Sequence, residues 1–246
     1  MRDAPAVAIL CGGRGTRLQE HTQSIPKPLV EIGGRPILWH VMMIYAAQGF
    51  GRFLLCTGYK GELIEEFAAG ARLLGDDIDV ECVDTGLDTP TGGRLAKLRD
   101  RLEGGTFFVT YGDGLADIDL RTELDFHRRH GSLATMTVVR PHLQFGVATL
   151  DGDHRVVGFE EKPRSEHWIN GGFFCFEPGA LEYLDERSVL EREPLERLAA
   201  DGELRAFHHT SFWDCMDTYK DAVMLNDMWA EGRAPWKVWP GEPATR

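Results

Sequence analysis

The chain has 246 residues, of which 43% are hydrophobic and 27% are charged, a composition typical of soluble globular proteins. Its 39 acidic residues outnumber its 27 basic residues, and the resulting formal charge of −12 argues against a nucleic-acid partner that needs a broad basic face. No apolar run approaches the roughly 20 residues that span a bilayer, and no signal peptide begins the chain, so we expect a cytoplasmic protein with no membrane partner.

The first half of the chain alternates short apolar runs with helical patterns. Strands are predicted at 6–10, 52–58, 78–83 and 106–112. Helices are predicted between them at 35–49, about 60–69 and 92–102. Such alternation is typical of a parallel sheet with helices on both faces.

The second half has a different pattern, in which several strands follow one another. A helix is predicted over 119–131, followed by strands at 133–140, 144–151, 156–163 and 170–178. A helix near 192–200, a strand at 203–208 and a helix at 218–231 complete the pattern. These segments predict a mixed extension of the same sheet. The expected fold is therefore α/β: one Rossmann-like three-layer α/β/α domain, with a mainly parallel central sheet and a smaller substrate-binding elaboration in the C-terminal half.

A glycine-rich loop follows the first strand, with the sequence Gly-Gly-Arg-Gly-Thr-Arg at 12–17. Glycine lets bare backbone approach a ligand, and successive N–H groups can form a nest for phosphate. The spelling fits neither the P-loop nor the dinucleotide-binding fingerprint. A plain glycine turn with solvated arginines is the structural alternative. The nearby Pro26-Lys27-Pro28 favours the phosphate site, because two prolines fix the backbone around one cation.

Asp113 lies between two glycines at the carboxyl end of the strand predicted at 106–112. Open α/β sheets place ligand-binding groups at this edge, and a carboxylate there is a natural Mg²⁺ ligand. The second acid is expected elsewhere in the chain, and a turn-forming Asp-Gly is the structural alternative. The candidates for that second acid are Asp117, Asp119, Asp214 and Asp217.

Three further segments combine glycine or proline with a polar side chain. Lys162 is fixed by Pro163, Asn170 precedes two glycines, and Thr91 is a plausible N-cap of a helix whose N-terminus can meet an anion. A solvated charge cluster, a β-bulge and simple helix capping are the respective alternatives. The histidines have no zinc-binding spacing, and no nucleophilic-serine motif is present.

Taken in order, "GGRGTRL", "PKP", "YGDG", "EKP" and "NGG" resemble the motifs of the sugar-1-phosphate nucleotidylyltransferases. Within that family, "KPLVEIGGRPILWHVM", "GYKG", "VDTG", "TGGRL" and "FWDCMDT" resemble the glucose-1-phosphate cytidylyltransferases. The resemblance covers roughly residues 5 to 239. It implies transfer of a nucleotidyl group from an NTP, CTP above all, to α-D-glucose 1-phosphate, giving CDP-glucose and pyrophosphate.

The resemblance also implies roles for particular residues. About 5–115 would form the nucleotide-binding half and about 116–239 the sugar-phosphate-binding half of the single domain. Nucleotide contacts are implied at Leu10, Gly12, Gly13, Gly15, Thr16, Thr91, Gly92 and Gly93. Sugar-phosphate contacts are implied at Gly146, Glu161, Lys162, Asn170 and Gly171. Arg17 would meet the leaving pyrophosphate, Lys27 the α-phosphate, and Asp113 with Asp217 the Mg²⁺ cofactor.

Elementary chemistry agrees with those roles. Attack of one phosphate oxygen on another phosphorus brings like charges together, so positioned cations matter more than a covalent nucleophile. The attacking phosphate is already ionised at neutral pH, so no general base is expected. Alternatives are another NTP or another sugar or cyclitol 1-phosphate, or a non-catalytic nucleotide-sugar-binding regulatory subunit. A nicotinamide dehydrogenase is disfavoured by the spelling of the first loop, and a homo-oligomer is expected.

Overall fold

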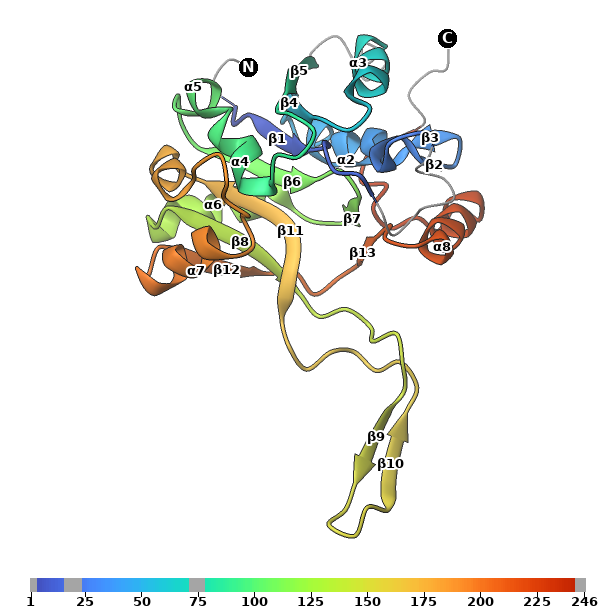
Figure 1. Cartoon of the computed structure of the whole chain (residues 1–246). Coiled ribbons are helices and arrows are strands. Elements are labelled where there is room, and N and C mark those ends of the chain that lie inside the picture. Colours follow the sequence, from blue (N-terminus) through green and yellow to red (C-terminus); the bar gives the residue numbers. More distant parts are fainter. Residues whose placement is uncertain (1–3, 16–23, 71–77, 242–246) are drawn as a thin grey trace.

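The computed structural model describes residues 4–15, 24–70 and 78–241, and its centre is a seven-stranded sheet (Figure 1). The strand order is β12-β8-β11-β6-β1-β4-β5. These strands are β1 (Val7–Leu10), β4 (Arg52–Thr57), β5 (Asp79–Asp84), β6 (Phe107–Tyr111), β8 (Ala134–Val139), β11 (Ile169–Phe176) and β12 (Leu204–His208).

The sheet is mixed and mainly parallel, as the sequence predicts. β1 pairs in parallel with both β4 and β6, β4 pairs in parallel with β5, and β12 does so with β8. Only β11 runs antiparallel to its neighbours in this sheet, β6 and β8. The central strands are continuous apolar runs because both faces of the sheet are covered.

Alternate residues of each central strand enter two separate cores. Val7 and Ile9 of β1 pack in one core with α2 (Ile37–Ala46), α6 (Leu120–His130) and α8 (Tyr219–Ala230). Ala8 enters the other core with α4 (Thr91–Ala96), α5 (Arg99–Leu102), the 3-10 helix η4 (Pro178–Tyr183) and α7 (Glu193–Ala200). The chain therefore has the three α/β/α layers predicted from its sequence. Among the described residues, no helix is long and apolar enough to cross a membrane.

Two predicted details of these layers are wrong in their boundaries. The helix expected over 92–102 is two short helices, α4 and α5, separated by Lys97 and Leu98. The helix expected to start at 35 starts at Ile37, because Arg35 and Pro36 form the short strand β3 beside β2 (Glu31–Ile32). The helix α3 (Gly61–Ala69) lies where it was predicted.

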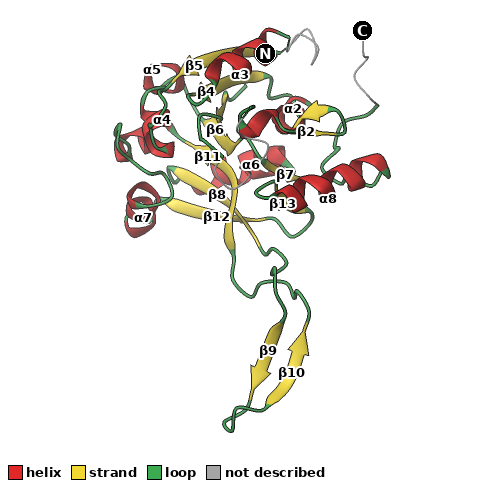
Figure 2. Ribbon diagram, turned by 45° about the vertical axis from the view of Figure 1, so that its right-hand side comes forward, coloured by secondary structure: helices red, strands yellow, loops and turns green. Residues whose placement is uncertain are grey.

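The segments 144–151 and 156–163 do not extend the central sheet, which corrects the sequence-based expectation. They form β9 (Val147–Leu150) and β10 (Val156–Glu160), an antiparallel pair that projects from the body as an arm (Figures 1 and 2). The apolar side chains of the arm remain exposed, because nothing else in the described chain covers either face of the pair. We use "the arm" for residues 143–168.

Candidate active site

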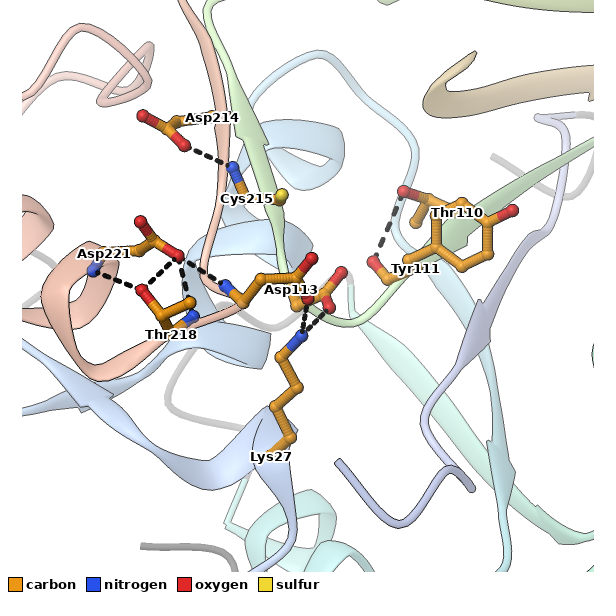
Figure 3. Close-up of polar contacts among 9 residues, drawn as sticks. Lys27, Thr110, Tyr111, Asp113, Asp214, Cys215, Thr218 and Asp221 are labelled. Carbon is orange, nitrogen blue, oxygen red and sulfur yellow. Dashed lines mark hydrogen bonds and ion pairs between the residues drawn. The ribbon is translucent and has the colours of Figure 1, made fainter. Parts of the chain in front are cut away.

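Lys27 lies between two carboxylates at the carboxyl edge of the central sheet. It opens the 3-10 helix η2 (Lys27–Leu29), with a proline on either side. Its Nζ lies 2.5 Å from Asp113 Oδ2 and 2.6 Å from Asp217 Oδ1. Figure 3 shows the ammonium group directed at Asp113. The three predicted residues therefore converge on one point.

A small antiparallel ribbon brings Asp113 and Asp217 together. Asp113 lies between β6 and β7 (Gly114–Ala116), and β7 pairs with β13 (Trp213–Cys215). The ribbon continues beyond its pairing, because the Met216 amide donates a hydrogen bond to the Asp113 carbonyl at 3.0 Å. Both strands are only three residues long and were not predicted. They nevertheless place the second acid, which the residues alone left open among four candidates.

The N-terminal cap of α8 holds the backbone of Asp217. Thr218 and Asp221 form a capping box, in which each side chain accepts a hydrogen bond from the other residue's amide. Asp221 Oδ2 also accepts a hydrogen bond from the Asp217 amide at 3.1 Å. Figure 3 shows this cap beside the Lys27–Asp113 pair. The orientation of Asp217 is therefore tied to the start of the helix.

The net charge of this cluster favours binding of a cation. Burial alone would lower the pKa of Lys27, but the Asp113 and Asp217 carboxylates raise it above its ordinary value, so the ammonium stays charged. Two carboxylates against one ammonium give a net negative charge beside a cavity. One or two carboxylates with substrate phosphates and water are the usual ligands of Mg²⁺. Asp113 and Asp217 fit such an ion.

A cavity of about 510 Å³ opens beside the cluster. Its walls come from the end of β1, the glycine-rich loop, η2, the turn before α4 and the end of β6. Eight predicted site residues line it, namely Leu10, Gly12, Gly13, Gly15, Lys27, Thr91, Asp113 and Asp217. Thr16 and Arg17 lie outside the described residues, so the roles given to them stay predictions.

Arg94 also lines the cavity and was not singled out from the sequence. Its side chain is buried, and its guanidinium donates to the carbonyls of Thr57 at 2.9 Å and Gly12 at 2.9 Å. A Cβ on Gly12 would lie 1.9 Å from Arg94 Nη1. Gly12 is therefore needed for close approach to this arginine. The sequence feature that could have identified Arg94 is its position directly after Gly92 and Gly93, at the start of a helix.

Gly92 and Gly93 do not line the cavity. A Cβ on Gly92 would lie 2.8 Å from the Ser188 carbonyl, and one on Gly93 would lie 2.3 Å from the Glu186 carbonyl. The Gly93 amide donates to the Ser188 carbonyl at 3.0 Å. These glycines let α4 pack against the 186–188 backbone, which accounts for them without a contact to the base.

The wall of the cavity beyond Lys27 carries two hydroxyl groups that share one carboxylate. Tyr111 Oη donates to Glu191 Oε1 at 2.5 Å, and Thr91 Oγ1 donates to Glu191 Oε2 at 2.6 Å. Asn170 Nδ2 approaches Tyr111 Oη at 3.4 Å. Asn170 is thus the predicted sugar-side residue that reaches the cavity wall. Neither Tyr111 nor Glu191 was proposed from the sequence.

The other predicted sugar-side residues lie elsewhere. The Gly171 carbonyl accepts a hydrogen bond from Trp213 Nε1 at 2.6 Å, beneath the β7–β13 ribbon. Gly146, Glu161 and Lys162 belong to the arm, where Lys162 Nζ lies 3.6 Å from Glu161 Oε1. None of these residues lines the cavity of its own chain.

The remaining acidic candidates have structural partners. Asp119 is the N-cap of α6 and accepts a hydrogen bond from the Thr122 amide. Asp117 accepts a hydrogen bond from Ser211 and lies 3.1 Å from His209 Nε2. Burial raises the pKa of Asp214 to about 6. Only Asp217 of the four contacts Lys27 through an interaction in the described structure.

Comparison with known proteins gives consistent results. The family model of nucleotidyl transferases matches residues 6–217. The glucose-1-phosphate cytidylyltransferase of Salmonella typhi and a probable one of Bacillus subtilis are each 42% identical, over 94% of this chain and 98% of theirs. A solved structure of a putative glucose-1-phosphate thymidylyltransferase from Bacillus anthracis matches with a TM-score of 0.72 over 98% of each chain. At 19% identity, that match concerns the fold.

Proposed function

Since this chain belongs to the nucleotidyl transferase family, we propose that it transfers the cytidylyl group of CTP to α-D-glucose 1-phosphate, forming CDP-glucose and pyrophosphate. The family membership confirms the resemblance found in its sequence motifs. The choice of CTP and glucose 1-phosphate is supported by the relatives that share 42% of its residues and nearly their whole length.

One observation carries the proposal: Lys27, Asp113 and Asp217 meet at the edge of a cavity that is also lined by the glycine-rich loop and by Arg94. A triphosphate needs such backbone amides and cations. Acyl transfer would need an activated nucleophile, and the one cysteine among the described lining residues, Cys11, is fully buried, with its thiol pKa raised by burial.

We propose that the divalent ion of this reaction is Mg²⁺ and that Asp113 and Asp217 hold it. Nucleotidyl transferases generally use a divalent metal. When bound, the ion neutralises charge on the triphosphate oxygens. Lys27, which lies between both carboxylates, would then turn its ammonium toward the α-phosphate. The carboxylates keep Lys27 protonated until substrate arrives, so its ammonium supplies the positive charge.

The residues of the cavity act by positioning. The phosphate of the sugar is already an anion, and one of its oxygens forms a bond to the α-phosphorus. The bond from that phosphorus to the bridging oxygen breaks, and pyrophosphate leaves with the bonding electrons. Lys27 offsets the charge that builds up on the α-phosphate oxygens, while Gly12 and Gly13 present backbone to the nucleotide. Asn170 has an amide next to Tyr111, where it supports recognition of sugar hydroxyls.

We further propose that the chain forms a homo-oligomer in which a second copy covers the arm. Phe145 is 81% exposed and Phe159 is 68% exposed, and the strand residues Val156 and Val157 are exposed as well. An isolated pair of strands is at best marginally stable in water, and an apolar patch of this kind marks an interaction site. Assembly would also allow Glu161 and Lys162 to reach the cavity of a second copy, since they do not line the cavity of their own chain.

A pyrophosphate-release assay tests the activity. The purified chain is offered CTP, UTP, GTP, ATP and dTTP, each with glucose 1-phosphate, mannose 1-phosphate and a cyclitol phosphate. We expect release with CTP and glucose 1-phosphate at a kcat/KM at least about tenfold above every other pair. Nucleotide binding without pyrophosphate release from any pair would instead identify a regulatory subunit.

A further inference from the structure

Glu191 connects two parts of the cavity wall that lie far apart in the chain. Its Oε1 accepts a hydrogen bond from Tyr111, 80 residues earlier, and its Oε2 accepts one from Thr91, 100 residues earlier. Both partners line the cavity, one at the end of β6 and the other at the start of α4. Figure 3 shows the Tyr111 side chain directed away from the Lys27–Asp113 pair. The shared carboxylate therefore lies away from the metal-binding end.

The backbone that carries Glu191 is fixed against α4. The Leu190 amide donates to Thr91 Oγ1 at 2.9 Å, and Leu190 itself is buried. The Gly93 amide donates to the Ser188 carbonyl in the same segment. Although the Glu191 side chain is exposed, its position is thus set by the packing of its neighbours and not by chance.

A count of hydrogen bonds shows what Glu191 does to these two hydroxyl groups. Each hydroxyl has one hydrogen to donate, and an ionised carboxylate only accepts. Thr91 gives its hydrogen to Glu191 and uses one lone pair on the Leu190 amide, so one lone pair remains. Tyr111 gives its hydrogen to Glu191 as well and accepts a hydrogen bond from Asn170 Nδ2, so one lone pair remains there too. Burial and the nearby Glu191 raise the pKa of Tyr111, so the phenol keeps that hydrogen.

We propose that Glu191 is a specificity-determining positioning residue, which turns Thr91 and Tyr111 into hydrogen-bond acceptors and thereby selects a base that carries an amino group. The inference rests on the proposed transfer from CTP. Cytosine has an amino group at position 4, which donates, whereas uracil and thymine have an oxygen there, which only accepts. The oxygen at position 4 of uracil or thymine would face the lone pair of Thr91, so two hydrogen-bond acceptors would lie against each other. A buried acceptor without a donor is costly.

The test is the ratio of kcat/KM for CTP to kcat/KM for UTP, measured in the wild type and in Glu191→Gln. The amide of glutamine donates as well as accepts, so one hydroxyl is freed to point its hydrogen into the cavity. We expect the ratio to fall by about tenfold, through better use of UTP and poorer use of CTP. Thr91→Val removes the acceptor and should lower the ratio too, whereas Thr91→Ser should preserve it.

Two controls separate selection from general damage. Glu191→Asp keeps the carboxylate and should retain more of the preference than Glu191→Gln does. Glu196→Gln changes an exposed glutamate of α7 and should leave the ratio unchanged. A purely structural role for Glu191 predicts an equal loss with both nucleotides, and an unchanged ratio in Glu191→Gln would overturn the inference.

The inference and the proposed activity fail in different ways. If no nucleotide were turned over, the activity would be wrong, but the dissociation constants of CTP and UTP, measured by calorimetry without sugar, would still give the ratio for both proteins. A fall in that ratio of about tenfold in Glu191→Gln would support the role of Glu191. A wild type that binds and uses both nucleotides equally would refute it while leaving nucleotidyl transfer intact.

Discussion

The cavity and the arm are held in place in different ways. In the cavity, Lys27, Asp113 and Asp217 come from η2, the end of β6 and the segment before α8, and each lies against a buried core. In the arm, β9 and β10 pair with each other and with no other described strand, and their large apolar side chains are exposed. The catalytic charges are thus positioned by one chain alone, whereas the arm lacks the packing that would fix its residues.

This contrast divides the predicted substrate site into two parts. Five of the eight predicted nucleotide-side residues line one cavity of the chain, and Asn170 approaches that cavity through Tyr111. Gly146, Glu161 and Lys162 are on the arm and take no part in that convergence. We therefore expect changes in the cavity to act on the chemical step, and changes in the arm to act through assembly. Three variants test this division, and a fourth tests the core that carries the cavity.

The largest effect is expected from Asp113→Asn. The amide keeps the size of the side chain but loses the charge that binds the metal and holds Lys27. We expect kcat/KM to fall by about 10³-fold or more, with the melting temperature nearly unchanged. Asp125→Asn, an exposed acid of α6, is the matched control and should keep full activity. Normal turnover in Asp113→Asn would contradict the metal assignment.

A smaller effect is expected from the double substitution Phe145→Ser and Phe159→Ser in the arm. Burying one phenylalanine is worth about 2 kcal/mol, so losing part of two contacts should raise the dissociation constant of the oligomer by about 10²-fold. Sedimentation velocity over a range of concentrations measures it. Val223→Ser, an exposed apolar residue of α8, should leave assembly intact. An unchanged oligomer in the double variant would show that the arm is not the contact.

The core of the body contains an acid, and its titration should dominate the pH dependence of stability. Glu123 is fully buried and accepts a hydrogen bond from Thr137 at 2.7 Å. Burial raises its pKa to about 8, above the ordinary value near 4.5. The folded protein therefore holds a proton that the unfolded chain releases, so stability is greatest at low pH and is lost as the pH rises toward 8.

Glu123→Gln checks this sign. Relative to the variant, the wild type should lose about 1.4 kcal/mol of unfolding free energy per pH unit between pH 5 and 8, as measured by urea denaturation. Glu196→Gln, which changes an exposed glutamate of α7, should follow the wild type. If the unfolding free energies of the wild type and Glu123→Gln changed in parallel with pH, the carboxyl group would be ionised in the core.

The smallest effect is expected at the cap that orients Asp217. Thr218→Ala removes half of the capping box and should cost about 1 kcal/mol of unfolding free energy. It should also raise the Mg²⁺ concentration needed for half-maximal activity by a few-fold, because the Asp217 amide is bound to the same box. Asp119→Ala removes the cap of α6 at similar cost and should leave the Mg²⁺ requirement unchanged.

Much of the body could be predicted from the sequence because buried parallel strands are continuous apolar runs. β1, β4 and β6 have this pattern, and Asp113 follows such a strand at the edge where ligands bind. The arm was assigned to the central sheet because its apolar residues have the spacing of strands. That spacing indicates a strand, but it does not reveal what covers its faces.

Long-range contacts explain what the residues alone did not reveal. Asp217 lies 190 residues from Lys27, and the strands that bring it there are too short to have a periodic signal. The resemblance to a known family identified it. Arg94 and Glu191 were missed because their partners are backbone carbonyls and hydroxyl groups from distant segments. Glu191 has no local pattern that separates it from a surface charge, and Arg94 has only its position directly after a pair of glycines.

The most direct test of the account is ³¹P NMR of a mixture of CTP, glucose 1-phosphate and Mg²⁺ with the wild-type chain and with Asp113→Asn. With the wild type, we expect CDP-glucose and pyrophosphate to appear together in equal amounts. With the variant, or when EDTA removes the metal, both products should nearly vanish. Equal product formation by wild type and variant, or CTP bound by the wild type without any product, would contradict it.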